Sequence, residues 1–417
     1  MKCCADCFRD HVLHDRIESL NIKGDCEFCG ATETFVYDFA RMNDIQDALL
    51  TIMSLYEPAD TVGDHAGHSM AYELTSRWRL FNLSEDLTAK LLDVMYRETA
   101  SGVFDGYNLE TLLRGDVRLK VDETVTIAEH DWEKFAEHLK YRNRFFVSFI
   151  DLDELAKLIS CTRAICKSGT VLTRARIAEN PKGYAPGPDM GAPPAGLAGN
   201  GRINPVGISE LYTTVGSDDI ADDTALHEIR AGMHDYVTFG KITLDKTITV
   251  ADLSKISEIS PFDIDAEDLL LFAANLEILD GMARDIAKPM RRGDNPLEYI
   301  PSQYIAEFIK SLDEEQGGPY DGVMYNSTLR KGGVNLCLFA PEKYACDRTY
   351  TKQVNEITYV MGLWRISVSL LAATASILLA VLKSGALFIF EGAGEGKPKL
   401  SLMNHYHRSL SRPRRCG

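Results

Sequence analysis

Apolar residues recur every three to four positions through the first part of the chain, from about residue 31 to 168. Residues 42–56 and 84–96 show this spacing, and Ser84 stands at the N-cap position of the second segment. Residues 151–166 repeat the pattern. The spacing predicts a helical domain whose amphipathic faces pack on one another.

From about residue 170 the pattern changes to short runs rich in apolar and β-branched residues. VLTRARI (171–177) and ELYTT (210–214) predict strands, and residues 222–244 predict a helix followed by a strand. Between the first two strands, residues 180–201 hold five prolines and six glycines. Such a segment continues neither a helix nor a central strand, so it is either a linker or a shaped active-site loop. An acidic helical pattern follows at 265–286.

Length and charge narrow the class of protein. The 417 residues predict two or three domains. The formal net charge of −16 argues against sequence-independent nucleic-acid binding, which requires a cationic surface, but leaves room for a local basic pocket. The N-terminus MKCCADCFRDHVL lacks the apolar region of a signal peptide, so we expect a reducing, cytoplasmic environment.

Half of the ten cysteines lie in the first 29 residues, where Cys4 and Cys7 form one CxxC pair and Cys26 and Cys29 another. Two such pairs can place four thiolates around Zn²⁺. Four cysteines leave no open position for substrate water, so the prediction is a structural zinc site. Cys3 is an alternative to Cys4, although the spacing favours Cys4.

Histidines offer weaker metal candidates. Asp64, His65 and His68 could ligate a metal, but their glycine-rich surroundings favour a solvated loop. His130 and His138 lie on a predicted helix and are interpreted as surface or interface residues.

The C-terminal tail contains an uncharged run at residues 366–382, which is at the lower length limit for a membrane span. Its moderate hydrophobicity favours a helix covered by protein over a membrane contact. A tail not selected for folding is a third interpretation, and the basic ending RSLSRPRRCG suits it as well as lipid contact.

Five segments follow one another between residues 170 and 340: LTRARI, GRINPVGISELYTT, TALHEIR, PSQYIAEFIK and DGVMYNSTLRKGGVNLCLF. Together, and in this order, they resemble the RES domain family, named for its Arg, Glu and Ser residues. The cysteine pairs and helical middle region also resemble, more loosely, the zinc-knuckle and HEPN-like N-terminal region of one RES subgroup.

The resemblance implies which residues form the site. The family's two arginines fall on Arg174, with Arg176 as the neighbouring alternative, and on Arg202. Its tyrosine, glutamate and serine fall on Tyr212, Glu228 and Ser327.

The resemblance also implies an ADP-ribosyltransferase-like fold and an enzyme that consumes NAD⁺, in the manner of toxins paired with antitoxins. The residue types suit the chemistry. A carboxylate stabilises an oxocarbenium-like ribose, which assigns that role to Glu228. Guanidinium groups match a pyrophosphate, which suits Arg174 and Arg202. Tyr212 is assigned to stacking on the nicotinamide ring, and Ser327 to a hydrogen bond with nicotinamide or ribose.

The combined prediction is an α+β chain whose N-terminal zinc knuckle and helical domain precede an ADP-ribosyltransferase-like mixed α/β RES domain. The predicted borders are 1–30 for the zinc knuckle, 31–168 for the helical HEPN-like domain, 169–360 for the RES domain and 361–417 for the tail. The predicted function is a nicotinamide-releasing NAD⁺ glycohydrolase or phosphorylase with an antitoxin or regulatory protein as partner. ADP-ribosyl transfer to a macromolecule and a non-catalytic zinc-binding interaction protein are the alternatives.

Overall fold

The computed structural model describes most of the chain up to residue 355. The described residues are 1–42, 44–59, 67–96, 103–104, 107–121, 127, 132–147, 150–289 and 295–355. Met1–Val360 forms one compact unit and Met361–Gly417 a second, and the second lies wholly outside the described residues.

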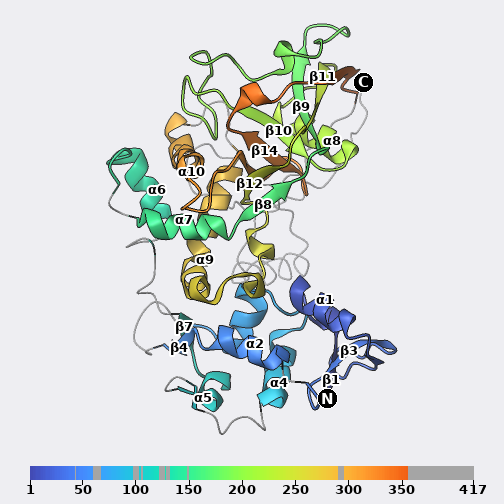
Figure 1. Ribbon diagram of the computed structural model, residues 1–417, viewed down its shortest axis with the longest axis vertical. Coiled ribbons are helices and arrows are strands. Elements are labelled where there is room, and N and C mark those ends of the chain that lie inside the picture. Colours follow the sequence, from blue (N-terminus) through green and yellow to red (C-terminus); the bar gives the residue numbers. More distant parts are fainter. Residues whose placement is uncertain are drawn as a thin grey trace, which may run out of the picture. The chain divides into compact units, whose positions relative to one another are not determined.

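A small antiparallel sheet opens the chain, with strand order β1-β3-β2. Its strands are β1 (Lys2–Cys4), β2 (Lys23–Gly24) and β3 (Thr34–Asp38). The 3-10 turn η1 (Ala5–Cys7) and helix α1 (His11–Ser19) connect the first two strands (Figure 1). Helix α1 begins where the Asp10 side chain accepts a hydrogen bond from Leu13 N at 3.0 Å.

Helices and short strands alternate in the next part of the chain. The elements are α2 (Asp44–Met53), β4 (Tyr56–Pro58), α3 (Met70–Tyr72), the π-helical turn η2 (Glu73–Arg77), α4 (Glu85–Tyr96), β5 (Val103–Phe104), β6 (Tyr107–Asn108), α5 (Leu109–Leu113), β7 (Leu119–Val121), α6 (Trp132–Tyr141) and α7 (Leu152–Ser160). The predicted helices at 42–56 and 84–96 are present, and Ser84 Oγ accepts a hydrogen bond from Leu87 N at 3.3 Å. The short strands, such as β4 and β7, were not predicted because three residues are too few to show a period of two.

The helical prediction for residues 151–166 is wrong in its second half. Helix α7 ends at Ser160, and residues Arg163–Cys166 form strand β8. Ile165 and Cys166 pair with Thr249 and Ile248 of a neighbouring strand, so the tertiary sheet decides the conformation here.

An eight-stranded sheet dominates the described residues beyond 160, with strand order β15-β11-β9-β10-β14-β13-β12-β8 (Figure 1). Besides β8 its strands are β9 (Val171–Ala178), β10 (Leu211–Val215), β11 (Tyr236–Thr243), β12 (Ile248–Asp252), β13 (Gly322–Asn326), β14 (Val334–Leu338) and β15 (Arg348–Gln353). All neighbours pair antiparallel except β12 and β13. The strands predicted at 171–177 and 210–214 are confirmed, and the whole is a mixed α+β structure with one large sheet.

Three longer helices accompany this sheet: α8 (Asp218–Glu228), α9 (Ala266–Ala287) and α10 (Ile300–Ser311). Short 3-10 turns connect them and the strands: η4 (Pro188–Met190), η5 (Ile256–Glu258), η6 (Pro261–Asp263), η7 (Pro296–Tyr299) and η8 (Pro341–Lys343). Helix α9 packs on α6 and α7. At Gly281 a Cβ atom would lie 2.6 Å from Trp132 Cβ, so glycine permits the close contact between α9 and α6.

The predicted border at residue 168 falls between two strands of this one sheet, β8 and β9. Lys140 of α6 also pairs with Glu298 at 2.9 Å, across the same border in sequence. The four predicted segments therefore remain predictions, since the structure groups the described residues up to 355 in one unit.

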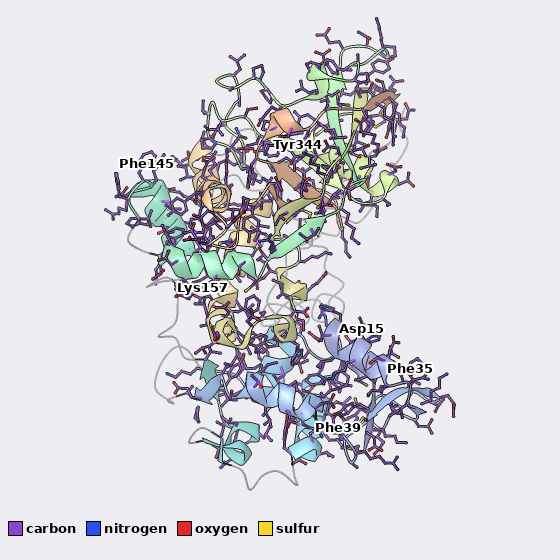
Figure 2. All side chains as sticks on the ribbon, in the orientation of Figure 1. Asp15, Phe35, Phe39, Phe145, Lys157 and Tyr344 are labelled. Carbon is purple, nitrogen blue, oxygen red and sulfur yellow. The ribbon has the colours of Figure 1, made fainter. Side chains whose placement is uncertain are left out.

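Most large apolar side chains of this unit are buried, but two that follow α6 are exposed. Phe145 and Phe146 are 83% and 85% exposed, and Figure 2 shows Phe145 beyond the end of that helix. Over the described residues, no helix is both long enough and apolar enough to cross a membrane. The uncharged run at 366–382 lies outside those residues, so the interpretations of the tail stay open.

Candidate functional site

A cavity of about 270 Å³ brings together four of the residues predicted to act on substrate. Arg174, Arg202, Tyr212 and Glu228 all line it. The remaining lining residues are Thr173, Ala175, Thr213, Thr214, Ala225, Ile229, Tyr325 and Asn335. The cavity is therefore formed by β9, β10, β13, β14, the end of α8 and the loop before β10.

Glu228, the last residue of α8, has two hydrogen bonds on one carboxylate oxygen. Ser327 Oγ donates to Oε1 at 2.6 Å, and Asn335 Nδ2 donates to the same oxygen at 2.9 Å. Across the described part of the chain, the hydrogen bonds to Glu228 both reach Oε1 and none reaches Oε2. The two donors fix the orientation of the carboxylate and leave its second oxygen available to a ligand.

The β13–β14 hairpin delivers both donors. Tyr325 pairs with Asn335 in the register of the two strands, and Ser327 N donates to Gly333 O at 2.8 Å. A Cβ atom on Gly333 would lie 2.5 Å from Thr224 Oγ1. Glycine at this position therefore lets the hairpin approach α8 closely enough for Ser327 and Asn335 to reach Glu228.

A buried lysine holds the other end of α8 against the sheet. Lys241 is only 3% exposed, and its Nζ lies 2.8 Å from Asp218 Oδ1, 2.7 Å from Asp222 Oδ1 and 2.9 Å from Thr173 Oγ1. All three N–H donors of the ammonium group thus have an acceptor, which offsets the cost of burying its charge. The contact fixes the helix at its first turns and so helps to place Glu228 at its end.

Arg202 reaches the cavity from the loop before β10. Its Nη1 donates to Ile286 O at 2.9 Å, and its guanidinium carbon lies 5.5 Å from the centre of the Tyr325 ring. Ile286 stands at the C-terminal end of α9, where the helix dipole favours a cation. No carboxylate of the described residues forms an ion pair with Arg202, so its other N–H groups can bind an anion.

The structure separates the two neighbouring arginines of β9. Arg174 lines the cavity, and its Nη1 donates to Tyr212 O at 2.9 Å. Its Nε is buried without a hydrogen-bond partner, and burial together with the nearby Arg176 charge lowers the pKa of Arg174 to about 10. Arg176 is not among the lining residues, and its Nη2 donates to Gly191 O at 2.8 Å. Arg174 is therefore the β9 arginine placed to meet a ligand.

Tyr212 lines the cavity, but its hydroxyl group is hydrogen-bonded to the loop that precedes β10. The hydroxyl donates to Asn204 Oδ1 at 2.7 Å and accepts from Ile203 N at 2.9 Å. A Cβ atom on Gly201 would lie 2.6 Å from this hydroxyl, so the loop needs glycine there. Burial raises the pKa of Tyr212 well above its ordinary value. The Tyr212 hydroxyl therefore joins β10 to residues 203 and 204 of the loop.

The Pro/Gly-rich segment at 180–201 packs against the sheet. Met190 is fully buried, Tyr184 N donates to Thr238 Oγ1 at 3.1 Å, and Thr349 Oγ1 donates to Tyr184 O at 3.0 Å. Of the two interpretations left open by the sequence, the structure supports the shaped loop rather than the linker.

A larger cavity of about 780 Å³ lies elsewhere in the unit. Its lining includes residues 9–11, 78–79, 160–164 and 252, with several from 255–268. Basic and acidic side chains are mixed along it, for example Arg79 with Asp265. It contains none of the predicted site residues, so its greater size does not make it the better candidate for the chemistry.

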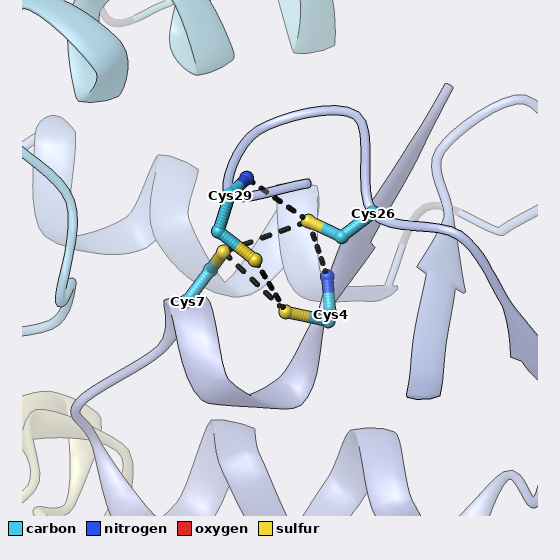
Figure 3. Close-up of side chains that lie close together, drawn as sticks. All are labelled: Cys4, Cys7, Cys26 and Cys29. Carbon is cyan, nitrogen blue, oxygen red and sulfur yellow. Dashed lines mark hydrogen bonds between the residues drawn. The ribbon is translucent and has the colours of Figure 1, made fainter. Parts of the chain in front are cut away.

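Four cysteine thiols form a separate cluster at the N-terminus (Figure 3). The cluster consists of Cys4, Cys7, Cys26 and Cys29. The sulfur of Cys4 lies 3.5 Å from that of Cys7 and 3.4 Å from that of Cys29, and the sulfurs of Cys7 and Cys26 are 3.6 Å apart.

These separations fit a metal ion. Tetrahedral Zn–S bonds of about 2.3 Å place the sulfurs about 3.8 Å apart, far beyond the length of a disulfide bond. The backbone N–H groups of Cys4, Phe28 and Cys29 also point to the sulfur of Cys26. Although burial raises the pKa of Cys26, these donors lower it to about 6 and so favour the thiolate. The cluster could hold a metal, and Cys4 rather than Cys3 belongs to it.

The weaker metal candidates gain no support. His68 stacks on Tyr72 with ring centroids 3.9 Å apart and belongs to no metal-binding group among the described residues. Asp64, His65 and His130 lie outside the described residues. His138 lies on α6 and likewise belongs to no such group.

Two of the lining residues that sequence reasoning did not single out contact predicted site residues: Tyr325 lies against Arg202, and Asn335 donates to Glu228. Asn335 is a buried polar residue inside the apolar strand VNLCL, and such an interruption is a signal that its amide has a specific partner. Tyr325 in GVMYN gives no comparable signal, because a tyrosine in a strand is ordinary.

A RES domain is found by comparison with family models, over residues 172–360. The matched region contains every lining residue of the 270 Å³ cavity that holds Glu228. Neither a curated protein nor a solved structure matches the chain. The resemblance to ADP-ribosyltransferases and to the zinc-knuckle and HEPN-like subgroup therefore stays a prediction.

Proposed function

We propose that this RES domain cleaves the N-glycosidic bond between nicotinamide and ribose in NAD⁺. The RES family is associated with NAD⁺-degrading toxins. The observation that carries the proposal is the convergence of Arg174, Arg202, Tyr212 and Glu228 on one cavity, with Ser327 bonded to the glutamate.

Glu228 supplies the negative charge that the reaction needs. As the C1′–N bond breaks, its electron pair leaves with nicotinamide, which departs as a neutral molecule, and positive charge develops on the ribose. The free Oε2 of Glu228 stabilises that charge while accepting a hydrogen bond from a ribose hydroxyl. Water, or phosphate in a phosphorylase, adds at C1′, and the proton lost from water passes to solvent. No metal ion is needed for these steps.

Arg202 and Arg174 bind the pyrophosphate. Arg202 has further N–H groups that can donate to a ligand. Arg174, whose Nε is buried without a hydrogen-bond partner, has no carboxylate partner among the described side chains. An anion in the cavity would compensate the desolvation of Arg174, so both arginines favour a doubly charged ligand over a neutral one.

The polar contacts lead us to propose a different role for Ser327 and to keep the role expected for Tyr212. Ser327 acts on Glu228 through its 2.6 Å hydrogen bond, instead of contacting nicotinamide directly. Tyr212 can still present its ring to nicotinamide, because its hydroxyl is engaged in the loop while the residue lines the cavity. Both roles are part of the proposal.

We further propose that the four-cysteine cluster binds one structural Zn²⁺. A closed set of four thiolates has no position for substrate water, so the ion would stabilise the fold around β1, η1 and β3 without taking part in the reaction.

Release of nicotinamide from NAD⁺ tests the proposed reaction. The purified chain should release it, and Glu228→Gln should lower kcat by at least about 100-fold because the charge of the stabilising carboxylate is removed. Thermal unfolding of the variant is the control for its fold. NAD⁺ labelled in the adenosine half distinguishes hydrolysis, with label in small molecules, from transfer, with label on a macromolecule. The absence of nicotinamide release by the wild type would contradict the proposal.

A further inference from the structure

Side chains in the first turn of α10 form hydrogen bonds with the loop that carries Arg202. Gln303 Nε2 lies 2.8 Å from Asn200 Oδ1, 2.7 Å from Gly201 O and 3.0 Å from Asn204 O. Next to it, Ser302 Oγ donates to the backbone oxygen of Arg202 at 2.6 Å. Two consecutive side chains of α10 thus hold the backbone on both sides of Arg202.

These contacts are buried. Gln303 is 8% exposed and Ser302 is 2% exposed. A buried amide or hydroxyl is costly unless it is hydrogen-bonded. The Gln303 amide is directed at the loop, and Ser302 Oγ lies closer to Arg202 O, at 2.6 Å, than to Tyr299 O, at 3.0 Å. The loop conformation and the start of α10 are therefore coupled.

The last turn of α10 holds the other end of the same segment. Lys310 Nζ lies 2.7 Å from Oε1 of Glu210, a buried residue directly before β10. Helix α10 therefore contacts residues 200–204 through Ser302 and Gln303, and residue 210 through Lys310. The cavity is lined by none of these three side chains.

The contacts from α10 add to the hydrogen bonds that the loop forms within itself. Gly201 directly precedes Arg202 and Gly199 lies two residues earlier, and glycine loses more backbone freedom on ordering than any other residue. In the described structure the guanidinium group itself has one hydrogen bond, to Ile286 O. Without Gln303, the glycine-rich side of Arg202 would lose its contact with α10 and keep only bonds within the loop, such as Gly201 N to Asn204 O at 3.0 Å and Asn204 Nδ2 to Gly199 O at 2.9 Å.

We propose that Gln303 is a positioning residue that sets the affinity of the cavity for the anionic part of its substrate, by fixing the backbone from which Arg202 extends. This inference rests on the proposed function of Arg202 in binding pyrophosphate. It gives a physical role to the segment PSQYIAEFIK, which contributes no residue to the cavity wall.

The test is the steady-state kinetics of Gln303→Ala with NAD⁺. Because the interaction serves binding rather than bond cleavage, KM should rise about tenfold while kcat changes by less than about twofold. Gln46→Ala is the matched control. Gln46 is also 8% exposed and its Nε2 also donates to a backbone oxygen, that of Phe39, but it lies on α2 and does not line the cavity. The control should lose stability without a change in KM.

Calorimetric titration with ADP-ribose provides a measurement that is independent of turnover. If Gln303→Ala fails to fold, Ser302→Ala is the second variant. Weaker ADP-ribose binding by either variant, with binding by Gln46→Ala unchanged, supports the inference. Wild-type KM and ADP-ribose affinity in the folded loop variants would overturn it while leaving the proposed function intact. Failure of the wild type itself to turn over NAD⁺ and to bind ADP-ribose would overturn both.

Discussion

The cysteine cluster and the cavity are built in opposite ways. The four thiols come from two short segments within the first 29 residues, and a tight turn separates the members of each pair. The cavity draws side chains from residues 173 to 335, and the Ser327–Glu228 contact alone joins positions 99 residues apart. Local spacing suffices to predict the cysteine cluster. The cavity depends on the register of the eight-stranded sheet and on how α8 and α10 pack against the segments around them.

The comparison predicts that the two sites fail independently. Removing a side chain from the cavity should impair turnover without releasing metal. Removing a thiol of the cluster should release the metal and leave turnover nearly unchanged. Three sets of variants test this separation, in decreasing order of their expected effect on turnover.

The donors to Glu228 should have the largest effect in this series. Ser327→Ala and Asn335→Ala each remove a hydrogen bond to a carboxylate, so kcat should fall by about tenfold or more. Because both donors act on Oε1, the double variant should lose less than the product of the two single effects. Initial rates of nicotinamide release measure the change, with metal content as the control. Unchanged rates in both single variants would show that Glu228 does not depend on this hairpin.

The paired arginines of β9 should differ in effect. Arg174→Lys, which keeps the charge but loses the planar donor group, should raise KM for NAD⁺ about tenfold. Arg176→Lys should change KM by less than about twofold, because that side chain contacts Gly191 outside the cavity. The two substitutions are matched in chemistry and are two residues apart in one strand. Equal effects would contradict the assignment of Arg174 to the ligand.

The smallest effect on turnover is expected at the cysteine cluster. Cys26→Ser should abolish binding of one Zn²⁺ per chain, measured by native mass spectrometry, and should destabilise the N-terminal sheet. Nicotinamide release at 25 °C should stay within about twofold of the wild type, since no cysteine of the cluster lines the cavity. Cys3→Ser is the control and should retain the metal. Wild-type metal content in Cys26→Ser would contradict the proposed site.

The sequence allowed much of the candidate site to be assembled before its geometry was known. The predicted strands at 171–177 and 210–214 are present, and the predicted residues Arg174, Arg202, Tyr212 and Glu228 line one cavity. It did not distinguish Arg174 from Arg176, because alternate residues of a strand share a face. The expected contact of Ser327 with the substrate stays a prediction, and its hydrogen bond to Glu228 was not foreseen, since the partner of a hydroxyl group cannot be inferred from its own segment.

The amino-acid sequence by itself determined the local features of this protein: the cysteine spacing, the periods of the helices and strands, and the glycines that give the loop before β10 its freedom. The tertiary structure alone decided that residues 163–166 form a strand, that Asn335 and Ser327 share one oxygen of Glu228, and that α10 holds Arg202 in place. These outcomes arise from contacts between distant segments, whose geometry is fixed only when the sheet forms and buries its polar groups in pairs.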